Sequence, residues 1–352
     1  MLCYSIIFPS LLVLLFITPP VKSFDLCVGQ DYGSMQRYLE HFPAPPLTMS
    51  YMNLTFHGLT SPTSYGSGVQ WAEGASALSS SGAVAIGLDL GGVSGLSSLL
   101  SQPSPPSLSP LLNFLRSPSR NGSLLRIGYE FDNPQFGYTS SPGLYRSAFS
   151  SVSSSLPSGV GAVWHTWARS ASPDHLADFY PWDDEAAVDK VGVSIFRHPY
   201  REAGEESMES LDAVLAFARG VGKRVVVAES TPFGGYDERW IRTVRDWIRR
   251  NDDIVDVWCY IDCDWDGFAQ WRGVGFGDTR IWENGGAELW EEVVEEAGGD
   301  TGGWEIPSNV GWGVAAAGFA AGAVVFFVVV GGGKWRKRKG YVKLGAGEDE
   351  QQ

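Results

Sequence analysis

Short apolar runs alternate with segments of helical periodicity between residues 24 and 297 of this 352-residue chain. The runs are rich in β-branched side chains and end at polar or turn-forming residues, as β-strands do. Eight strands are predicted, at Asp25–Val28, Leu47–Met52, Ala83–Leu88, Leu124–Tyr129, Val160–His165, Lys190–Phe196, Arg224–Ala228 and Ile254–Ile261. Because helical segments separate them, the strands are expected to run parallel with right-handed crossovers.

Several of the intervening segments carry apolar residues at the spacing of a helix with one buried face. The clearest are Met35–Phe42, Tyr145–Val152, Met208–Leu215, Trp240–Ile248 and Trp290–Ala297. Two other segments, Ser76–Gly82 and Ser101–Pro110, are rich in serine, glycine and proline. We expect long loops or broken helices at these two places.

Eight strand–helix units over about 275 residues fit a closed (β/α)8 TIM barrel, an α/β fold whose usual length is about 250 residues. The alternative is a doubly wound open sheet. That fold often carries a G-x-G-x-x-G turn after its first strand, and this chain has none there. We therefore expect a single barrel domain over residues 24–297.

The two ends of the chain predict a secreted-side protein anchored in a membrane. Residues 1–23 contain an apolar run followed by a small polar end, which is typical of a signal peptide. After a glycine-rich linker at 298–309, residues 310–330 carry no charge and are long enough to span a bilayer as one transmembrane helix. A basic cluster between Lys334 and Lys339 predicts that the tail, 331–352, is cytoplasmic. We expect a type I protein of the secretory pathway or cell surface, and a glycolipid anchor is the less favoured alternative.

The predicted outer domain is strongly acidic. The whole chain has a formal net charge of −14. The predicted outer domain alone carries about −18, because the net positive charge of the predicted tail is then left out. Such a charge repels nucleic acid, so we expect no nucleic-acid partner. The motifs Asn53-Leu54-Thr55 and Asn121-Gly122-Ser123 predict glycosylation at Asn53 and Asn121.

Three cysteines remain after removal of the signal peptide: Cys27, Cys259 and Cys263. The first and last strands of a closed barrel are neighbours, so a disulfide between Cys27 and one of the other two is one interpretation. Three buried free thiols are the other. No C-x-x-C motif or histidine cluster has metal-ligand spacing, and we expect neither a metal nor a cofactor.

Two glutamates stand where reacting groups of barrel enzymes are found, at the ends of strands. Glu130 follows the fourth predicted strand and Glu229 follows the seventh. Hydrolysis of a glycosidic bond needs one carboxylic acid to protonate the leaving oxygen and one carboxylate to attack the anomeric carbon. The two groups lie about 5 to 5.5 Å apart when the configuration is retained. Strands on opposite sides of a barrel can supply such a pair.

The segments around these glutamates resemble those of the family 26 glycoside hydrolases. Arg126–Asp132, with the sequence RIGYEFD, is similar to the acid/base segment of that family, and Ala228–Pro232, AESTP, is similar to the nucleophile segment. Between them, Phe179–Pro181 and Val188–Ser194 resemble the sixth-strand region. The resemblance implies a retaining clan A barrel in which Glu130 is the acid/base and Glu229 the nucleophile.

The chain departs from that family at two positions. Tyr129 precedes the acid/base, where the mannanases of the family have histidine. Phe196 stands near the place of a sixth-strand tyrosine that supports the nucleophile, and a phenylalanine cannot donate a hydrogen bond. The resemblance therefore implies a substrate only as broad as a β-linked mannan, glucan or related polymer.

Polar and aromatic residues near the strand ends are candidates for substrate contacts, since aromatic rings stack on the apolar faces of sugars. The candidates are Tyr129, Asp132, Asn133, Tyr138, His165, Trp167, Trp258 and Trp265. His165 is equally well interpreted as a core histidine. Trp240, Trp247 and Trp290 have helical spacing and are expected in the core.

These features together predict a retaining endo-β-glycosidase that acts on a β-linked polysaccharide by double displacement. A barrel without catalytic activity that binds glycan as a membrane-anchored receptor is the alternative. An enzyme that remodels glycans by transglycosylation has the same sequence features as a hydrolase.

Overall fold

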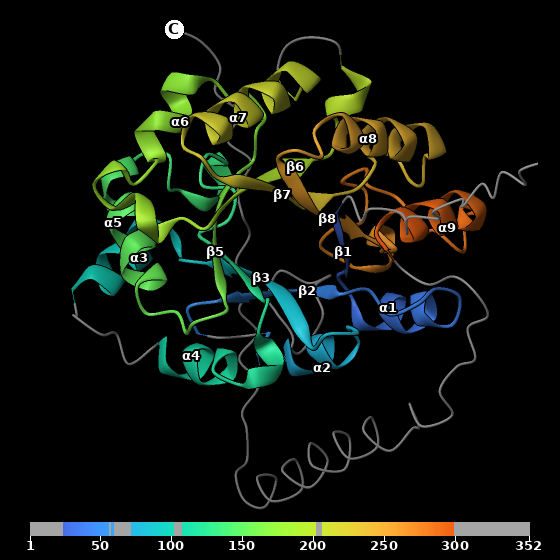
Figure 1. Ribbon diagram of the computed structural model, residues 1–352, viewed down its shortest axis with the longest axis horizontal. Helices are drawn as coiled ribbons and strands as arrows, with labels where there is room; N and C mark the ends of the chain where they lie inside the picture. Colours follow the sequence, from blue (N-terminus) through green and yellow to red (C-terminus); the bar gives the residue numbers. More distant parts are fainter. Residues whose placement is uncertain (1–23, 56–57, 60–71, 102–107, 202–205, 299–352) are drawn as a thin grey trace, which may run out of the picture. The chain divides into compact units, whose positions relative to one another are not determined.

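In the computed structural model, the eight strands form a closed parallel barrel in chain order (Figure 1). The structure describes residues 24–55, 58–59, 72–101, 108–201 and 206–298. The strands are β1 (Asp25–Gly29), β2 (Leu47–Asn53), β3 (Ala83–Asp89), β4 (Leu124–Ile127), β5 (Gly161–Thr166), β6 (Lys190–Ile195), β7 (Arg224–Ser230) and β8 (Val255–Ile261). The eight predicted strands and the closed barrel are confirmed, and the open sheet is excluded because β1 pairs with β8.

Helices surround the barrel (Figure 1). They are α1 (Tyr32–Leu39), α2 (Ala72–Ala77), α3 (Gly92–Leu100), α4 (Ser109–Leu115), α5 (Pro142–Ser153), α6 (Pro173–Phe179), α7 (Met208–Gly220), α8 (Glu238–Arg250) and α9 (Ala287–Glu296). The segment Ser101–Pro110 begins directly after α3 ends at Leu100 and includes the start of α4 at Ser109, while α2 has only six residues. These are the two regions where serine, glycine and proline lower helix propensity.

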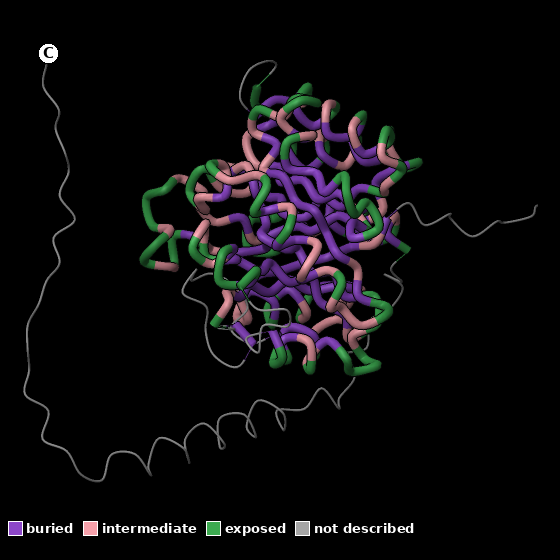
Figure 2. Tube along the Cα trace, turned by 90° about the vertical axis from the view of Figure 1, so that its left-hand side faces the viewer, coloured by how far each residue is buried: buried purple, intermediate pink, exposed green. Residues whose placement is uncertain are grey.

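Alternate residues of each strand face two different hydrophobic cores. Val257, Cys259 and Ile261 of β8 point into the barrel, where they pack with inward side chains of the other strands. Trp258 and Tyr260 point outward and pack in the larger core between the barrel and its helices. Trp240, Trp247 and Trp290 also lie in this outer core, as expected. Figure 2 shows the buried strands in the middle of the domain, with the exposed segments around them.

The predicted signal peptide, the transmembrane segment 310–330 and the tail lie outside the described residues, as does nearly all of the linker. Among the helices of the described part, none is long and apolar enough to cross a membrane. At the two predicted glycosylation positions, Asn53 is half-buried at the end of β2 and Asn121 is exposed. The attachment of glycans there stays a prediction.

Candidate active site

A cavity of about 790 Å³ opens at the carboxyl ends of the strands, and both predicted catalytic glutamates line it. Glu130 is only 6% exposed and Glu229 only 7%. Side chains from the ends of the first, third, sixth and eighth strands complete the lining, including Gln30, Asp89, Phe196 and Trp265. The sequence positions chosen for the chemistry are therefore brought together in one cleft.

Glu229 reaches the cleft because β7 is irregular at Ala228. Val226 and Ala228 already face the barrel interior, so regular alternation would turn Glu229 outward. The pairing with β6 shifts at this point: Val193 is opposite Val227, and Ser194 is opposite Glu229. Ala228 is thus the extra residue of a bulge, and the bulge turns the Glu229 side chain inward.

Glu229 is held by an arginine and a tyrosine from other strands. The Arg126 guanidinium, which is only 1% exposed, forms an ion pair with the Glu229 carboxylate. Burial leaves the pKa of Glu229 above its usual value, although Arg126 and the Tyr51 hydroxyl oppose this shift. Burial would lower the pKa of Arg126, but Tyr51 and Glu229 raise it, so the guanidinium stays charged. An ionised carboxylate in this position is suited to nucleophilic attack.

A glycine makes room for this arginine. Gly87 on β3 is opposite both Tyr51 and Arg126, and the Arg126 Cζ atom lies 4.7 Å from the centre of the Tyr51 ring. A Cβ atom at Gly87 would lie 2.8 Å from Tyr51 Cδ1 and 3.0 Å from Arg126 Nη2. The absence of a side chain at Gly87 therefore permits the contact that positions Glu229.

We expect Gly87→Ala to lower the free energy of unfolding by about 1 to 3 kcal/mol, because the added methyl group overpacks the barrel interior. Displacement of Arg126 should also reduce activity. Urea unfolding measures the first effect. Gly220→Ala is the matched control, since a Cβ at Gly220 meets nothing within 4 Å. Equal stability of the two variants would contradict this account of Gly87.

Glu130 follows a sharp change of backbone direction. β4 ends at Ile127, two residues earlier than predicted, because Gly128 and Glu130 both have positive φ angles, 57° and 50°. A left-handed conformation is uncommon for glutamate and is typical of functional sites. The Glu130 carboxylate accepts hydrogen bonds from Asn133 Nδ2 at 2.8 Å and from Ser194 Oγ at 2.6 Å.

Burial, followed by the nearby Glu229 carboxylate, raises the pKa of Glu130 to about 8. Ser194 and Asn133 oppose this shift without cancelling it. The two glutamates therefore have different environments: Glu229 faces a buried cation, and Glu130 faces a buried anion. At neutral pH this difference favours a protonated Glu130 and an ionised Glu229, as an acid and a nucleophile require.

The raised pKa of Glu130 predicts a pH dependence of stability. Ionising this carboxyl is harder in the folded state than in the unfolded state, so its contribution to stability is complete below about pH 4 and is lost as the pH rises through 8. The wild type should lose up to about 1.4 kcal/mol of unfolding free energy per pH unit in this range relative to Glu130→Gln. Urea unfolding at pH 5, 6, 7 and 8 measures the difference. If the unfolding free energies of the wild type and Glu130→Gln change with pH in parallel, the raised pKa of Glu130 is contradicted.

Four of the predicted substrate contacts line the cavity: Tyr129, Asn133, Trp167 and Trp265. Asp132 does not line it. The Asp132 carboxylate instead accepts hydrogen bonds from Thr166 Oγ1 at 2.6 Å and from the Trp167 backbone amide at 2.5 Å. Asp132 thus fixes the loop that carries Trp167.

Three other predicted contacts do not face the cavity. Trp258 is fully buried in the outer core, where it packs against Phe24 and Trp290. The prediction for Trp258 is wrong because this residue precedes the inward Cys259 and so faces the opposite side of the strand. The ring of Tyr138 is also buried, and its hydroxyl donates to Asp89 Oδ1 at 2.6 Å. His165 is fully buried beneath Glu130 rather than exposed to substrate.

Several residues of the cavity were not predicted. Tyr51 lines the cavity, and Arg126 does not line it but pairs with Glu229. Both were predicted only as strand residues, because an apolar run does not show which of its residues face inward. Trp271 and Phe276 come from the long segment between β8 and α9, and their rings pack against Trp265 to form an aromatic wall. This wall is suited to stacking on a sugar ring.

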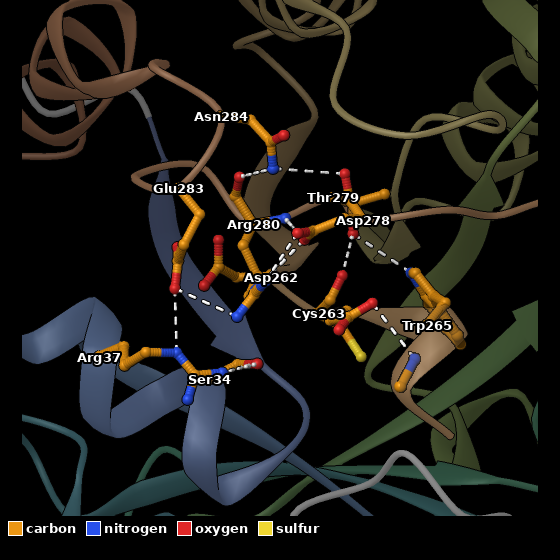
Figure 3. Close-up of polar contacts among 12 residues, drawn as sticks. Ser34, Arg37, Asp262, Cys263, Trp265, Asp278, Thr279, Arg280, Glu283 and Asn284 are labelled. Carbon is orange, nitrogen blue, oxygen red and sulfur yellow. Dashed lines mark hydrogen bonds and ion pairs between the residues drawn. The ribbon is translucent and has the colours of Figure 1, made fainter. Parts of the chain in front are cut away.

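Polar contacts anchor the segment that carries the aromatic wall. Glu283 lies between Arg37 of α1 and Arg280, with Oε1 2.9 Å from Arg37 Nε and 3.3 Å from Arg280 Nη1 (Figure 3). The Trp265 indole donates to Thr279 Oγ1 at 3.2 Å. The segment between β8 and α9, which contains one 3-10 turn at Trp265–Gly267, thereby presents its aromatic side chains in a fixed place.

Cys27, Cys259 and Cys263 are all free and buried in the structure, which agrees with the second interpretation of the cysteines. Cys27 and Cys259 are register partners on β1 and β8. Within the described ranges, no group of three or more histidine, cysteine, aspartate or glutamate residues could hold a metal ion.

A protein of known structure has a similar fold. The structure is similar to a family 26 β-mannanase from Bacteroides ovatus, with a TM-score of 0.55 and 10% sequence identity over 79% of this chain and 90% of the mannanase. At this sequence identity the similarity shows the fold, a (β/α)8 barrel. A family 113 β-1,4-mannanase aligns at a TM-score of 0.47 and 10% identity, covering 78% of this chain and 98% of that enzyme. No protein-family model matches the sequence, and no curated protein matches it.

Proposed function

We propose that this family 26-like barrel is a retaining glycoside hydrolase that cleaves a β-linked polysaccharide. The observation that carries the proposal is a pair of buried glutamates in one cleft, of which Glu229 pairs with Arg126 and Glu130 has a pKa of about 8. This is the arrangement in which one carboxyl donates a proton while the other attacks.

The reaction has two steps. In the first, a Glu229 oxygen bonds to the anomeric carbon, the glycosidic bond breaks, and Glu130 gives its proton to the leaving oxygen. In the second, Glu130 takes a proton from water, the water oxygen bonds to the anomeric carbon, and Glu229 is released. Both steps invert the anomeric carbon, so the product keeps the configuration of the substrate.

A β-linked mannan is the first substrate to test, because the similar structure is that of a β-mannanase. The experiment incubates the purified full chain with β-mannan, β-glucan and xylan and measures new reducing ends. Glu229→Ala is the control for contaminating enzymes. The proposal is supported if the wild type shortens at least one polymer and Glu229→Ala shortens none. It is contradicted if the wild type shortens none of the three polymers.

Phe196 lines the cleft and is the observation that favours a glycan-binding receptor over an enzyme, since it cannot donate a hydrogen bond to the nucleophile. Tyr51 reduces the force of that argument. Its hydroxyl, from β2, lies close enough to lower the pKa of Glu229. We therefore retain the enzyme as the proposal and the receptor as the second candidate.

We also propose that residues 310–330 anchor the domain as a type I membrane protein. The support is the uncharged 21-residue segment followed by basic residues. In sealed microsomes, added protease should remove the tail and leave the barrel intact. A protected tail would contradict this orientation.

A further inference from the structure

The two oxygens of the Glu130 carboxyl have different surroundings. Oε2 accepts from Asn133, which lines the cavity, and Oε1 accepts from Ser194, which does not. Ser194 lies on β6 and is fully buried. Oε2 is therefore the oxygen on the side of the cleft, and Oε1 is the oxygen on the side of the barrel interior.

Ser194 connects Glu130 to a buried histidine. His165 Nε2 lies 3.0 Å from Ser194 Oγ, and Ser194 Oγ lies 2.6 Å from Glu130 Oε1. A serine hydroxyl has one proton, and an ionised carboxylate can only accept. When Ser194 donates to Glu130, His165 must donate from Nε2, so the imidazole carries its proton there.

The surroundings of His165 keep the imidazole neutral. The ring is fully buried, and burial and the positive charge of Arg126 both lower its pKa well below the usual value. Nδ1 has no hydrogen-bond partner among the described residues. A proton on Nδ1 would be a buried donor without an acceptor, which disfavours the other tautomer.

The tautomer of His165 determines which oxygen of Glu130 holds the acidic proton. With the proton on Nε2, the Ser194 hydroxyl donates to Oε1 at 2.6 Å, a shorter hydrogen bond than the 2.8 Å bond from Asn133 to Oε2. The stronger donor at Oε1 keeps that oxygen as the carbonyl oxygen of the acid and favours the acidic proton on Oε2, on the side of the cleft. With the proton on Nδ1, Nε2 would accept from Ser194, and Ser194 would accept a proton from Oε1. The acid would then point into the barrel, away from substrate.

We propose that His165 and Ser194 are positioning residues that hold the acidic proton of Glu130 on its cleft-facing oxygen. The inference rests on the proposed function, in which Glu130 is the acid. It assigns a role to a buried histidine that touches no substrate, and to a serine that sequence analysis did not single out.

Other charged and titratable groups around Glu130 also affect its titration and must be held constant. They are Glu229 on β7, Asp132 after β4, Tyr51 on β2, Arg126 on β4, and His175 of α6, whose Nε2 lies 3.7 Å from Asp132 Oδ2. Ser194→Ala removes the hydroxyl and leaves all five in place.

The kinetic test compares Ser194→Ala with the wild type on polymer and on an activated aryl glycoside. Loss of a hydrogen bond to the ionised carboxylate should move the alkaline limb of the pH profile up by about one unit. Activity on polymer should fall about tenfold, while the aryl glycoside, which needs no proton, should change less than about twofold. Equal losses on both substrates would indicate a purely structural role and overturn the proposal.

Two further variants sharpen this test. His165→Gln places an amide donor near the position of Nε2 and should restore most of the activity that His165→Leu loses. Ser50→Ala is the matched control, since Ser50 is a buried barrel serine whose hydroxyl has no hydrogen-bond partner within the described structure. We expect both activities of Ser50→Ala to equal those of the wild type.

A measurement independent of activity separates this inference from the proposed function. Imidazole ¹⁵N shifts should report a neutral His165 protonated at Nε2, and ¹³C titration should give a higher Glu130 pKa in Ser194→Ala than in the wild type. A proton on Nδ1, or an unchanged Glu130 pKa, would overturn the inference even in an active enzyme. If the spectra give both predicted results while no polymer is cleaved, the proposed function fails. In that case His165 and Ser194 position a proton on a carboxyl group that is not catalytic.

Discussion

Replacing Glu229 with alanine should abolish hydrolysis of every glycan that the wild type cleaves. Without this carboxylate no glycosyl-enzyme can form, and the expected loss in kcat is on the order of 10⁴-fold or more. The loss should be the same for polymers and for activated aryl glycosides, because both need the nucleophile. Initial rates on both substrates measure it.

The control for Glu229→Ala concerns folding, because the substitution leaves the buried Arg126 without its anion. Glu229→Gln keeps the shape of the side chain and offers an oxygen to Arg126, so it should unfold at nearly the same urea concentration as the wild type and still be inactive. If either variant keeps most of its activity on polymer, Glu229 is not the nucleophile.

Replacing Glu130 with alanine should have an effect that depends on the leaving group. Cleavage of polymer should fall by roughly 10²- to 10⁴-fold, because the sugar alkoxide leaves poorly without a proton. An aryl glycoside with an acidic phenol should still form the glycosyl-enzyme, which then accumulates because no base activates water. Azide should restore turnover by attacking that intermediate. Product analysis with and without azide measures both effects.

The pH profile gives a second test of Glu130. Its pKa of about 8 means that the wild type should lose activity as the pH rises through 8, when the acid ionises. Glu130→Ala should lack this alkaline limb on the aryl substrate. A variant that keeps the limb would show that another group supplies the proton.

The sequence predicts where the strands lie but does not show which residues of each strand face the barrel interior. The eight strands could be predicted because each is a short apolar run, and a run carries no information about which residues face inward. Trp258 was misplaced for this reason: its neighbour Cys259 points into the barrel, so the tryptophan lies in the outer core. Arg126 was missed because it lies within a strand, where only a barrel register shows that it meets Glu229.

The position of Glu229 could be predicted, but its orientation could not. The bulge at Ala228 depends on the pairing of β7 with β6, which the local sequence AES does not encode. The aromatic wall of Trp265, Trp271 and Phe276 depends similarly on contacts with distant residues such as Arg37 of α1, through Glu283. Local pattern identified the catalytic candidates, whereas long-range pairing set their geometry.

The central claim is that Glu229 forms a covalent bond to the sugar, and an activated 2-deoxy-2-fluoro-β-glycoside tests it directly. The fluorine slows both steps, and the good leaving group restores the rate of the first step only, so the intermediate accumulates. After trypsin digestion and mass spectrometry, the account predicts one sugar on the peptide from Val225 to Arg239, attached to Glu229. Time-dependent inactivation with the sugar on any other residue, or hydrolysis of polymer that inverts the anomeric carbon, would contradict it.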